Sequence, residues 1–171
     1  MNIGIVGSDP RAIAIGRLLA SGGHDVTFSD PRDQGAAELA AAQIGTDAPH
    51  PYDQAITREL LIFACHRDDV DSVITAIGSH VDAVVVDALD GGPDAPHRGA
   101  ELLARKLDSH EVVRALIVLP QEGANIPICG DDPAAKAMVE EAFKECGCLT
   151  TDRGPLSNAP ELEPAGPLIA A

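Results

Sequence analysis

The chain has 171 residues, which suits a single domain, and its 45% of apolar residues include only 2% aromatics. The core must therefore be built from Ala, Val, Ile and Leu, a composition typical of parallel strands covered by helices. A formal net charge of −15 repels phosphate backbones and anionic membrane surfaces, which argues against nucleic acid and membranes as partners.

The chain starts directly at a predicted strand, with no charged and apolar leader before it. No apolar run approaches the length needed to span a membrane. We therefore expect a cytoplasmic protein whose four cysteines remain free thiols.

The first predicted strand, residues 2–6, ends in a glycine turn that opens into a helix at residues 11–20. This order is how a dinucleotide-binding domain begins. A G-x-G-x-x-G/A pattern that starts at Gly7 has Asp9 at the second glycine position and Ala12 at the permitted third position.

Asp9 has two interpretations. A pyrophosphate binds at a helix start because free amides point at it, and a carboxylate about 4 Å away would oppose it by about 4 kcal/mol at an effective dielectric near 20. Affinity would fall by up to about a thousandfold, unless Arg11 offsets part of the repulsion. Alternatively, Asp9 caps the helix and Pro10 is its first residue, an arrangement that needs no ligand.

The second predicted strand, residues 24–29, ends at Asp30, which lies 23 positions after Gly7. An acidic residue at about this spacing binds the ribose 2′-hydroxyl of NAD, whereas Arg32 would suit the 2′-phosphate of NADP. The alternative for Asp30 is an N-cap of the helix predicted at residues 33–43.

The remaining chain alternates strands with helices. Strands are predicted at residues 46–48, 59–64, 81–87, 111–119, 124–129 and 148–151, and helices at residues 68–77, 99–107 and 133–146. Asp68 is expected to cap the helix it begins, and Asp131 or Asp132 the last one. The pattern predicts an α/β fold, a Rossmann-like doubly wound and mainly parallel sheet, in one domain over residues 1–171. Residues from about 120 to 171 form a small C-terminal strand-helix-strand extension.

Besides the opening turn, four segments carry a resemblance to a known family. They are Gly23-His24-Asp25-Val26-Thr27, Glu111-Val112-Val113-Arg114-Ala115, Cys129-Gly130-Asp131-Asp132, and the run from Gly154-Pro155-Leu156 to Leu162-Glu163-Pro164. In order and spacing they resemble the NADP oxidoreductases that depend on the deazaflavin coenzyme F420. The resemblance implies hydride transfer between NADP or NAD and coenzyme F420 or a flavin, usually by a homodimer.

The resemblance also implies two groups of cofactor-binding residues at the carboxyl edge of the sheet. Gly7, Ser8, Asp9, Arg11, Asp30 and Arg32 would surround the dinucleotide, and Cys65, His66, Arg67 and Ala88 would lie beside the rings. For His66, an exposed loop position is the alternative. The family usually has a glycine in place of Asp9, a basic or small polar residue in place of Asp30, and Phe-Asn in place of Leu116-Ile117.

No side chain stands out as catalytic, and direct hydride transfer needs ring alignment more than an acid or base. Cys146-Gly147-Cys148 is interpreted as a helix end and a strand start, since no second ligand pair completes a metal site. A non-catalytic module with a degenerate phosphate loop remains an alternative. A hydroxyacid or imine reductase is a weaker one, because those enzymes need a large helical C-terminal domain.

Overall fold

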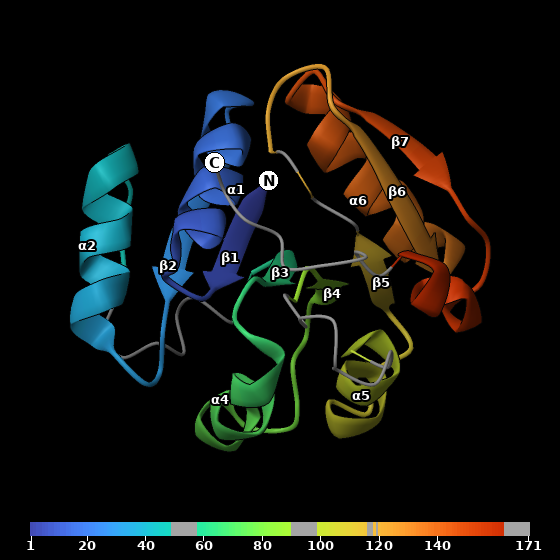
Figure 1. Ribbon diagram of the computed structural model, residues 1–171, viewed down its shortest axis with the longest axis horizontal. Helices are drawn as coiled ribbons and strands as arrows, with labels where there is room; N and C mark the ends of the chain where they lie inside the picture. The colour runs from blue at the N-terminus through green and yellow to red at the C-terminus, as the bar shows by residue number, and fades with distance from the viewer. Residues whose placement is uncertain (49–57, 90–98, 116–117, 119, 163–171) are drawn as a thin grey trace.

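A computed structural model describes residues 1–48, 58–89, 99–115, 118 and 120–162. Seven strands form one sheet in the order β2-β1-β3-β4-β5-β6-β7 (Figure 1). The strands are β1 (Asn2–Val6), β2 (Asp25–Ser29), β3 (Leu60–Phe63), β4 (Val84–Asp87), β5 (Val112–Ala115), β6 (Asn125–Gly130) and β7 (Leu149–Asp152). All neighbouring strands run parallel except β5 and β6, which are antiparallel. The α/β, Rossmann-like, mainly parallel sheet is thus confirmed.

Helices cover both faces of this sheet. The α-helices are α1 (Pro10–Ser21), α2 (Gln34–Ile44), α4 (Val70–Ile77), α5 (Gly99–Lys106) and α6 (Pro133–Glu145), and the 3-10 helices are η1 (Arg67–Asp69) and η2 (Leu156–Leu162). Successive side chains of a strand point to opposite faces, so a buried strand must be apolar throughout. In β3, Leu60 and Ile62 pack with α1, α2 and α6, whereas Leu61 and Phe63 pack with α4, α5 and η2.

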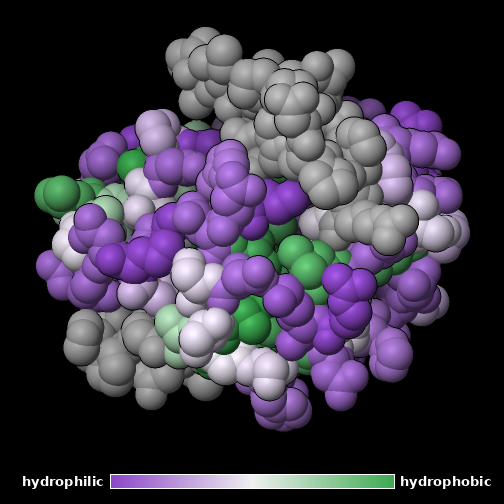
Figure 2. Space-filling view, turned by 60° about the horizontal axis from the view of Figure 1, so that its bottom comes forward, coloured by the Kyte–Doolittle hydropathy of each residue, from purple (hydrophilic) through white to green (hydrophobic). Residues whose placement is uncertain are grey.

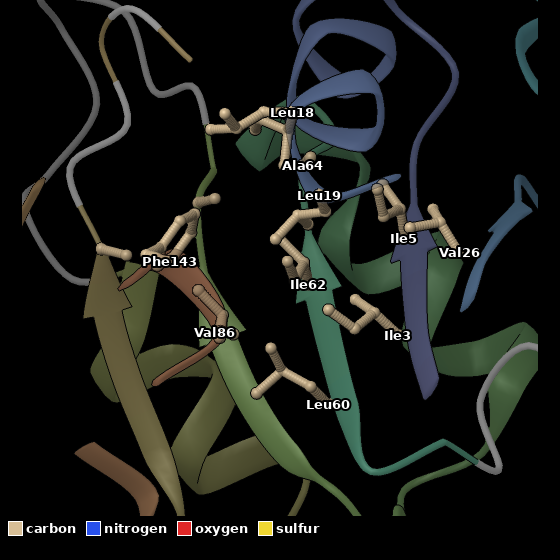
Figure 3. Packing of buried hydrophobic residues seen from close by; sticks show 14 of the residues in the cluster. Ile3, Ile5, Leu18, Leu19, Val26, Leu60, Ile62, Ala64, Val86 and Phe143 are labelled. Carbon is tan, nitrogen blue, oxygen red and sulfur yellow. The ribbon is translucent and has the colours of Figure 1, made fainter. Parts of the chain in front are cut away.

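The core on the side of α1 and α6 is large and aliphatic. Ile3, Ile62 and Val86 from three strands meet Leu19 of α1 and Phe143 of α6 (Figure 3). All five residues are fully buried. Each such side chain stabilises the fold by about 1.5–3 kcal/mol through burial, so this face holds β1, β3 and β4 firmly in register.

The opposite face is covered by α4 and α5, of eight residues each, and by η2. In a view from this side, hydrophobic residues are exposed in the middle of the surface, with hydrophilic residues around them (Figure 2). Within the described part of the chain, no helix is long and apolar enough to cross a membrane.

The C-terminal part has the strand-helix-strand order that the sequence predicts, with β6 and β7 parallel and α6 between them. A hydrogen bond links it to the N-terminal half: His24 Nε2 donates to the carbonyl oxygen of Ala142 at 2.9 Å. Gly22 fits against Cys146 so closely that a Cβ there would lie 2.5 Å from the Cys146 Sγ. The end of α1 and the end of α6 are therefore in direct contact.

Three predicted strands are shorter than expected. The strand predicted at residues 81–87 is formed only by Val84–Asp87. The strand predicted at residues 46–48 is reduced to a single parallel bridge between Thr27 and Asp47, where the Phe28 amide donates to the carbonyl oxygen of Asp47 at 2.9 Å. Of the strand predicted at residues 111–119, the structure describes Val112–Ala115 as a strand and Val118 as an exposed bend. Leu116 and Ile117 lie outside the described residues.

Candidate functional site

The turn after β1 is built around Gly7. Its φ is +132°, and a Cβ at this position would lie 2.7 Å from the carbonyl oxygen of Ala64. Its amide donates to the carbonyl oxygen of Ser29 at 2.9 Å, so the turn joins the ends of β1, β2 and β3. The first glycine of the pattern is thus required by the packing of the chain itself.

Asp9 is the N-cap of α1. Its Oδ1 accepts a hydrogen bond from the Ala12 amide at 2.8 Å, and Pro10 is the first helical residue. The capping interpretation of Asp9 is therefore confirmed. One of the amides that a pyrophosphate would use at this helix start already has a carboxylate partner.

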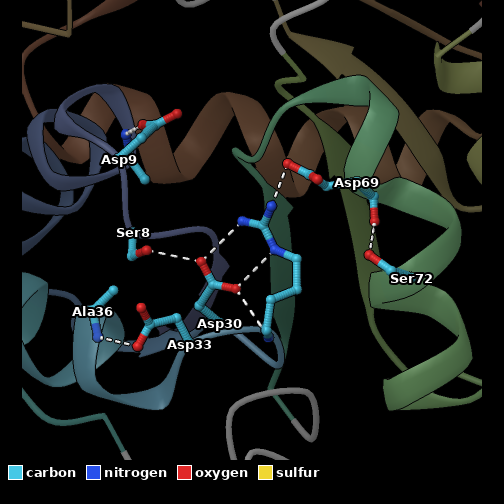
Figure 4. Close-up of polar contacts among 9 residues, drawn as sticks. Ser8, Asp9, Asp30, Asp33, Ala36, Asp69 and Ser72 are labelled. Carbon is cyan, nitrogen blue, oxygen red and sulfur yellow. Dashed lines mark hydrogen bonds and ion pairs between the residues drawn. The ribbon is translucent and has the colours of Figure 1, made fainter.

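Asp30 does not cap a helix. Asp33 is the N-cap of α2, where it accepts a hydrogen bond from the Ala36 amide at 3.0 Å. Asp30 is instead 3% exposed at the end of β2, and its Oδ2 accepts from Ser8 Oγ at 2.8 Å (Figure 4). The N-cap alternative for Asp30 is wrong, because its side chain turns toward the glycine turn instead of along α2.

Arg32 binds the same carboxylate from the other side. Its Nε donates to Asp30 Oδ1 and its Nη2 to Asp30 Oδ2, both at 3.0 Å, and its Nη1 forms an ion pair with Asp69 of η1. Ser8, Asp30 and Asp69 follow three neighbouring strands, β1, β2 and β3. The four side chains therefore form one polar chain along the carboxyl edge of the sheet, where open α/β sheets bind ligands.

The contacts among Asp30, Arg32 and Asp69 favour the charged forms of Asp30 and Arg32. Burial alone would raise the pKa of Asp30, but hydrogen bonds from Arg32 and Ser8 outweigh it and hold the pKa below its ordinary value. The Asp30 hydrogen bond raises the pKa of Arg32, against the opposing effect of burial, and Asp69 adds to the rise. The Asp30 and Arg32 side chains are both charged at neutral pH.

The residues expected beside the rings separate into two kinds. Cys65 and Ala88, which follow β3 and β4, are 2% and 1% exposed, and burial raises the pKa of the Cys65 thiol to about 12. His66 is exposed, and its Nδ1 accepts a hydrogen bond from the Asp68 amide at 3.3 Å. His66 therefore caps η1, and the expectation that Asp68 provides the cap is wrong.

Arg67 is buried and its side chain reaches the region of Asp87 and Gly99. A Cβ on Gly99 would lie 3.4 Å from Arg67 Nη2 and 3.0 Å from Asp87 Oδ2. Arg67 therefore extends toward the start of α5, on the face that α4 and α5 cover. Arg11, the third arginine predicted for the site, is also buried, in the first turn of α1.

One buried ion pair was missed by the sequence analysis. Arg114 Nη1 donates to Asp87 Oδ1 at 3.1 Å, and the two side chains are 1% and 0% exposed. The same Nη1 approaches the carbonyl oxygen of Leu89 at 3.3 Å, and the Leu89 amide donates to Asp87 Oδ1 at 3.0 Å. A charged residue in each of two otherwise apolar strands was the available signal.

Potential metal ligands do not cluster in the part of the chain that the structure describes. Among the described residues, no group of three or more His, Cys, Asp or Glu side chains is arranged to hold a metal ion. All four cysteines are buried and free. Cys146 ends α6 and Cys148 precedes β7, as the sequence predicts.

Solved structures share this fold. A candidate F420-dependent NADP reductase from Arthrobacter sp. is 19% identical, with a TM-score of 0.76 over 94% of this chain and 88% of that one. A hypothetical protein from Sinorhizobium meliloti is 18% identical, with a TM-score of 0.80 over 100% and 93%. An imine reductase from Streptomyces aurantiacus is 20% identical, with a TM-score of 0.71, but only 59% of its length is covered.

The family comparison is more specific than these likenesses of fold. The model of the family described as coenzyme F420-dependent NADP oxidoreductase matches residues 2–91. This segment runs from β1 through the Asp9 cap, Asp30 and Asp69 to the residues that follow β4. The chain belongs to the family of coenzyme F420-dependent NADP oxidoreductases.

Proposed function

We propose that this protein is an oxidoreductase that binds NAD or NADP at the carboxyl edge of β1, β2 and β3 and exchanges a hydride with a deazaflavin, such as coenzyme F420, or with a flavin. Membership of the family supports this reaction class. We also propose that it acts in the cytoplasm as a homodimer.

The observation that carries the proposal is the contact between Ser8 and Asp30. Ser8 belongs to the glycine turn, where a pyrophosphate would bind, and Asp30 stands where a ribose would bind. Asp30 is almost fully buried yet ionised, which is costly unless its oxygens have partners. Its oxygens accept hydrogen bonds from Ser8 Oγ and from the amide, Nε and Nη2 of Arg32. A ribose hydroxyl would take the place of the Ser8 hydroxyl as a donor to the same carboxylate, and in this way the residues present fit the sugar of a dinucleotide.

The phosphate end of the site fits less well. Glycine at position 7 lets the backbone turn tightly, but the Asp9 carboxylate lies at the start of α1 and Pro10 has no amide hydrogen to donate. Binding of a pyrophosphate would require the Asp9 side chain to release the Ala12 amide. We therefore expect a weaker affinity than an Asp9-free turn would give.

The ends of β3 and β4 would support the rings. Cys65, Ala88 and Leu89 are buried. All three are uncharged, since burial raises the pKa of the Cys65 thiol and keeps it protonated. When bound, a reduced nicotinamide would supply a hydride to the oxidised ring, and a proton from water would complete the reduction of that ring. These side chains would exclude water and orient the rings, which is the main contribution a protein makes to such a transfer.

The second candidate is a non-catalytic module of the same fold. One observation favours it, the Asp9 cap. The Ala12 amide at the start of α1 already has a hydrogen-bond partner within the chain and needs none from a ligand. In that case the surface would serve assembly and the dinucleotide would not bind.

One experiment separates the two candidates. The purified protein is mixed with NADH or NADPH and with oxidised coenzyme F420 or FMN, and the absorbances of both cofactors are followed. Stoichiometric loss of reduced nicotinamide and of oxidised acceptor, dependent on the protein, supports the oxidoreductase. No exchange at millimolar nicotinamide with either acceptor, in protein that melts cooperatively, would support the module.

A further inference from the structure

Arg32 is the one described residue near Asp30 that could attract the 2′-phosphate of NADP, yet two carboxylates already hold it. Its Nε and Nη2 form a bidentate pair with Asp30, and its Nη1 is paired with Asp69. Arginine recognises phosphate best through two parallel N–H groups. All three nitrogens of this guanidinium, Nε, Nη1 and Nη2, therefore already contact carboxylates.

Asp69 is held in place independently of Arg32. Its amide donates to the carbonyl oxygen of His66 at 3.0 Å, and its own carbonyl oxygen accepts from Ser72 Oγ at 2.8 Å. In Figure 4, Asp69 and Ser72 lie on one side of the view, and Ser8 and Asp30 lie on the other. The aspartate therefore contacts Arg32 from a turn after β3 whose backbone is held by hydrogen bonds within its own segment, residues 66–72.

The local charge opposes a phosphate dianion. Asp30 and Asp69 contribute two negative charges and Arg32 one positive charge, so the three side chains carry a net charge of −1. A ribose 2′-hydroxyl would donate to Asp30 Oδ2 in place of the Ser8 hydroxyl, whereas a 2′-phosphate would meet this negative charge and would have to compete for Arg32. Asp69, which belongs to η1, therefore opposes binding of the phosphate in addition to Asp30, which follows β2.

We infer that Asp69 is a specificity-determining residue that withholds Arg32 from a 2′-phosphate, so that this protein prefers NAD to NADP. The inference rests on the proposed dinucleotide site. It makes this chain differ from its family's description in the cofactor it selects, and assigns that difference to a residue 37 positions after Arg32 in the sequence.

The test uses 2′,5′-ADP and 5′-AMP, the adenosine ends of NADP and NAD, which share one 5′-phosphate and differ only in the 2′-phosphate. Calorimetric titrations compare the wild type with Asp69→Asn, with Asp69→Ala as a second variant. Asp71→Asn is the matched control, because Asp71 lies on the same segment and pairs with Lys106 at 2.6 Å instead.

Asp69→Asn and Asp69→Ala are expected to bind 2′,5′-ADP about tenfold more tightly than the wild type does, which corresponds to about 1.4 kcal/mol. Binding of 5′-AMP should stay unchanged, and Asp71→Asn should match the wild type for both ligands. Equal affinity of the wild type and both Asp69 variants for 2′,5′-ADP overturns the inference, as does an equal gain for 5′-AMP. Titration of the wild type with NADH tests the proposed site separately, so NADH binding without a gain in the variants overturns this inference alone.

Discussion

Asp9 Oδ1 accepts a 2.8 Å hydrogen bond from the Ala12 amide, so the first helix of this Rossmann domain is capped by its own chain. In a dinucleotide site a phosphate oxygen accepts hydrogen bonds from amides at this helix start. The same contact therefore stabilises the fold and competes with the proposed ligand.

Replacing Asp9 by Gly should increase affinity for NADH by about tenfold or more, because it removes a carboxylate and releases the Ala12 amide. The free energy of unfolding should fall by only a few tenths of a kcal/mol, as at other caps changed to glycine. Isothermal titration and urea unfolding measure the two effects.

Asp132 offers a matched control for this change. It caps α6 before Pro133 and accepts from the Ala135 amide at 2.7 Å, the same arrangement as Asp9 and Pro10. Asp132→Gly should lower stability equally and leave NADH affinity unchanged. An Asp9→Gly protein with wild-type affinity would show that the cap does not limit binding.

Gly7→Ala should destabilise the protein by about 2 kcal/mol or more, since a Cβ would meet the Ala64 carbonyl at 2.7 Å in a backbone conformation that side chains avoid. Gly45→Ala is the control, because Gly45 also has a positive φ but nothing within 4 Å of the added Cβ. It should cost about 1 kcal/mol. Equal losses in chemical denaturation would contradict the packing role of Gly7.

Breaking the Asp87–Arg114 pair should be the costliest polar change. Asp87→Ala leaves a buried guanidinium without its carboxylate, and about 3–5 kcal/mol of stability should be lost. Lys144→Met, which removes an exposed pair with Glu141, should change stability by less than about 0.5 kcal/mol. A loss below about 1 kcal/mol for Asp87→Ala would mean that water reaches the pair.

The contribution of Asp30 to the free energy of unfolding should decrease as the pH is lowered into the acid range. Its pKa in the folded protein lies below the ordinary value of 3.8, so the folded state binds this proton less readily than the unfolded state. The stabilisation is fully present above pH 3.8 and is lost as the pH falls through the folded-state pKa. Asp30→Asn should therefore be about 1–3 kcal/mol less stable than the wild type at pH 6, and the difference should shrink below pH 3.8. A gap that widens in acid would reverse the assigned sign.

The thiols should be unreactive in the native state. Burial raises the pKa of Cys65 to about 12 and the pKa of Cys129 and Cys146 to about 11, and Cys148 is also buried with a raised pKa. At pH 8 a disulfide reagent should label fewer than one thiol per chain within minutes, against four in urea. Rapid labelling of the native protein would show that one of these sites opens.

Local patterns were sufficient to predict most of the fold. The apolar run of β3 and the Asp-Pro starts of α1 and α6 are visible within a few residues, because burial and capping depend on near neighbours. The role of Asp30 was ambiguous, since Ser8 and Arg32 decide it and the cap of α2 lies only three residues later.

Contacts between distant segments could not be predicted in this way. Asp69 meets Arg32 only because β2 and β3 flank β1 in the sheet, an order that the sequence does not state. Asp87 and Arg114 are paired by the register of β4 and β5, which places them directly opposite each other. Both contacts depend on strand order or register, and neither leaves a short motif.

The most direct measurement is a calorimetric titration of the wild-type protein with NADH, repeated with Asp30→Ala. We expect saturable binding at or below millimolar concentration in the wild type, and an affinity about tenfold lower or more when the Asp30 carboxylate is removed. No binding at millimolar NADH, or equal binding by the wild type and Asp30→Ala, would contradict the assignment of Asp30 and Ser8 to a dinucleotide site.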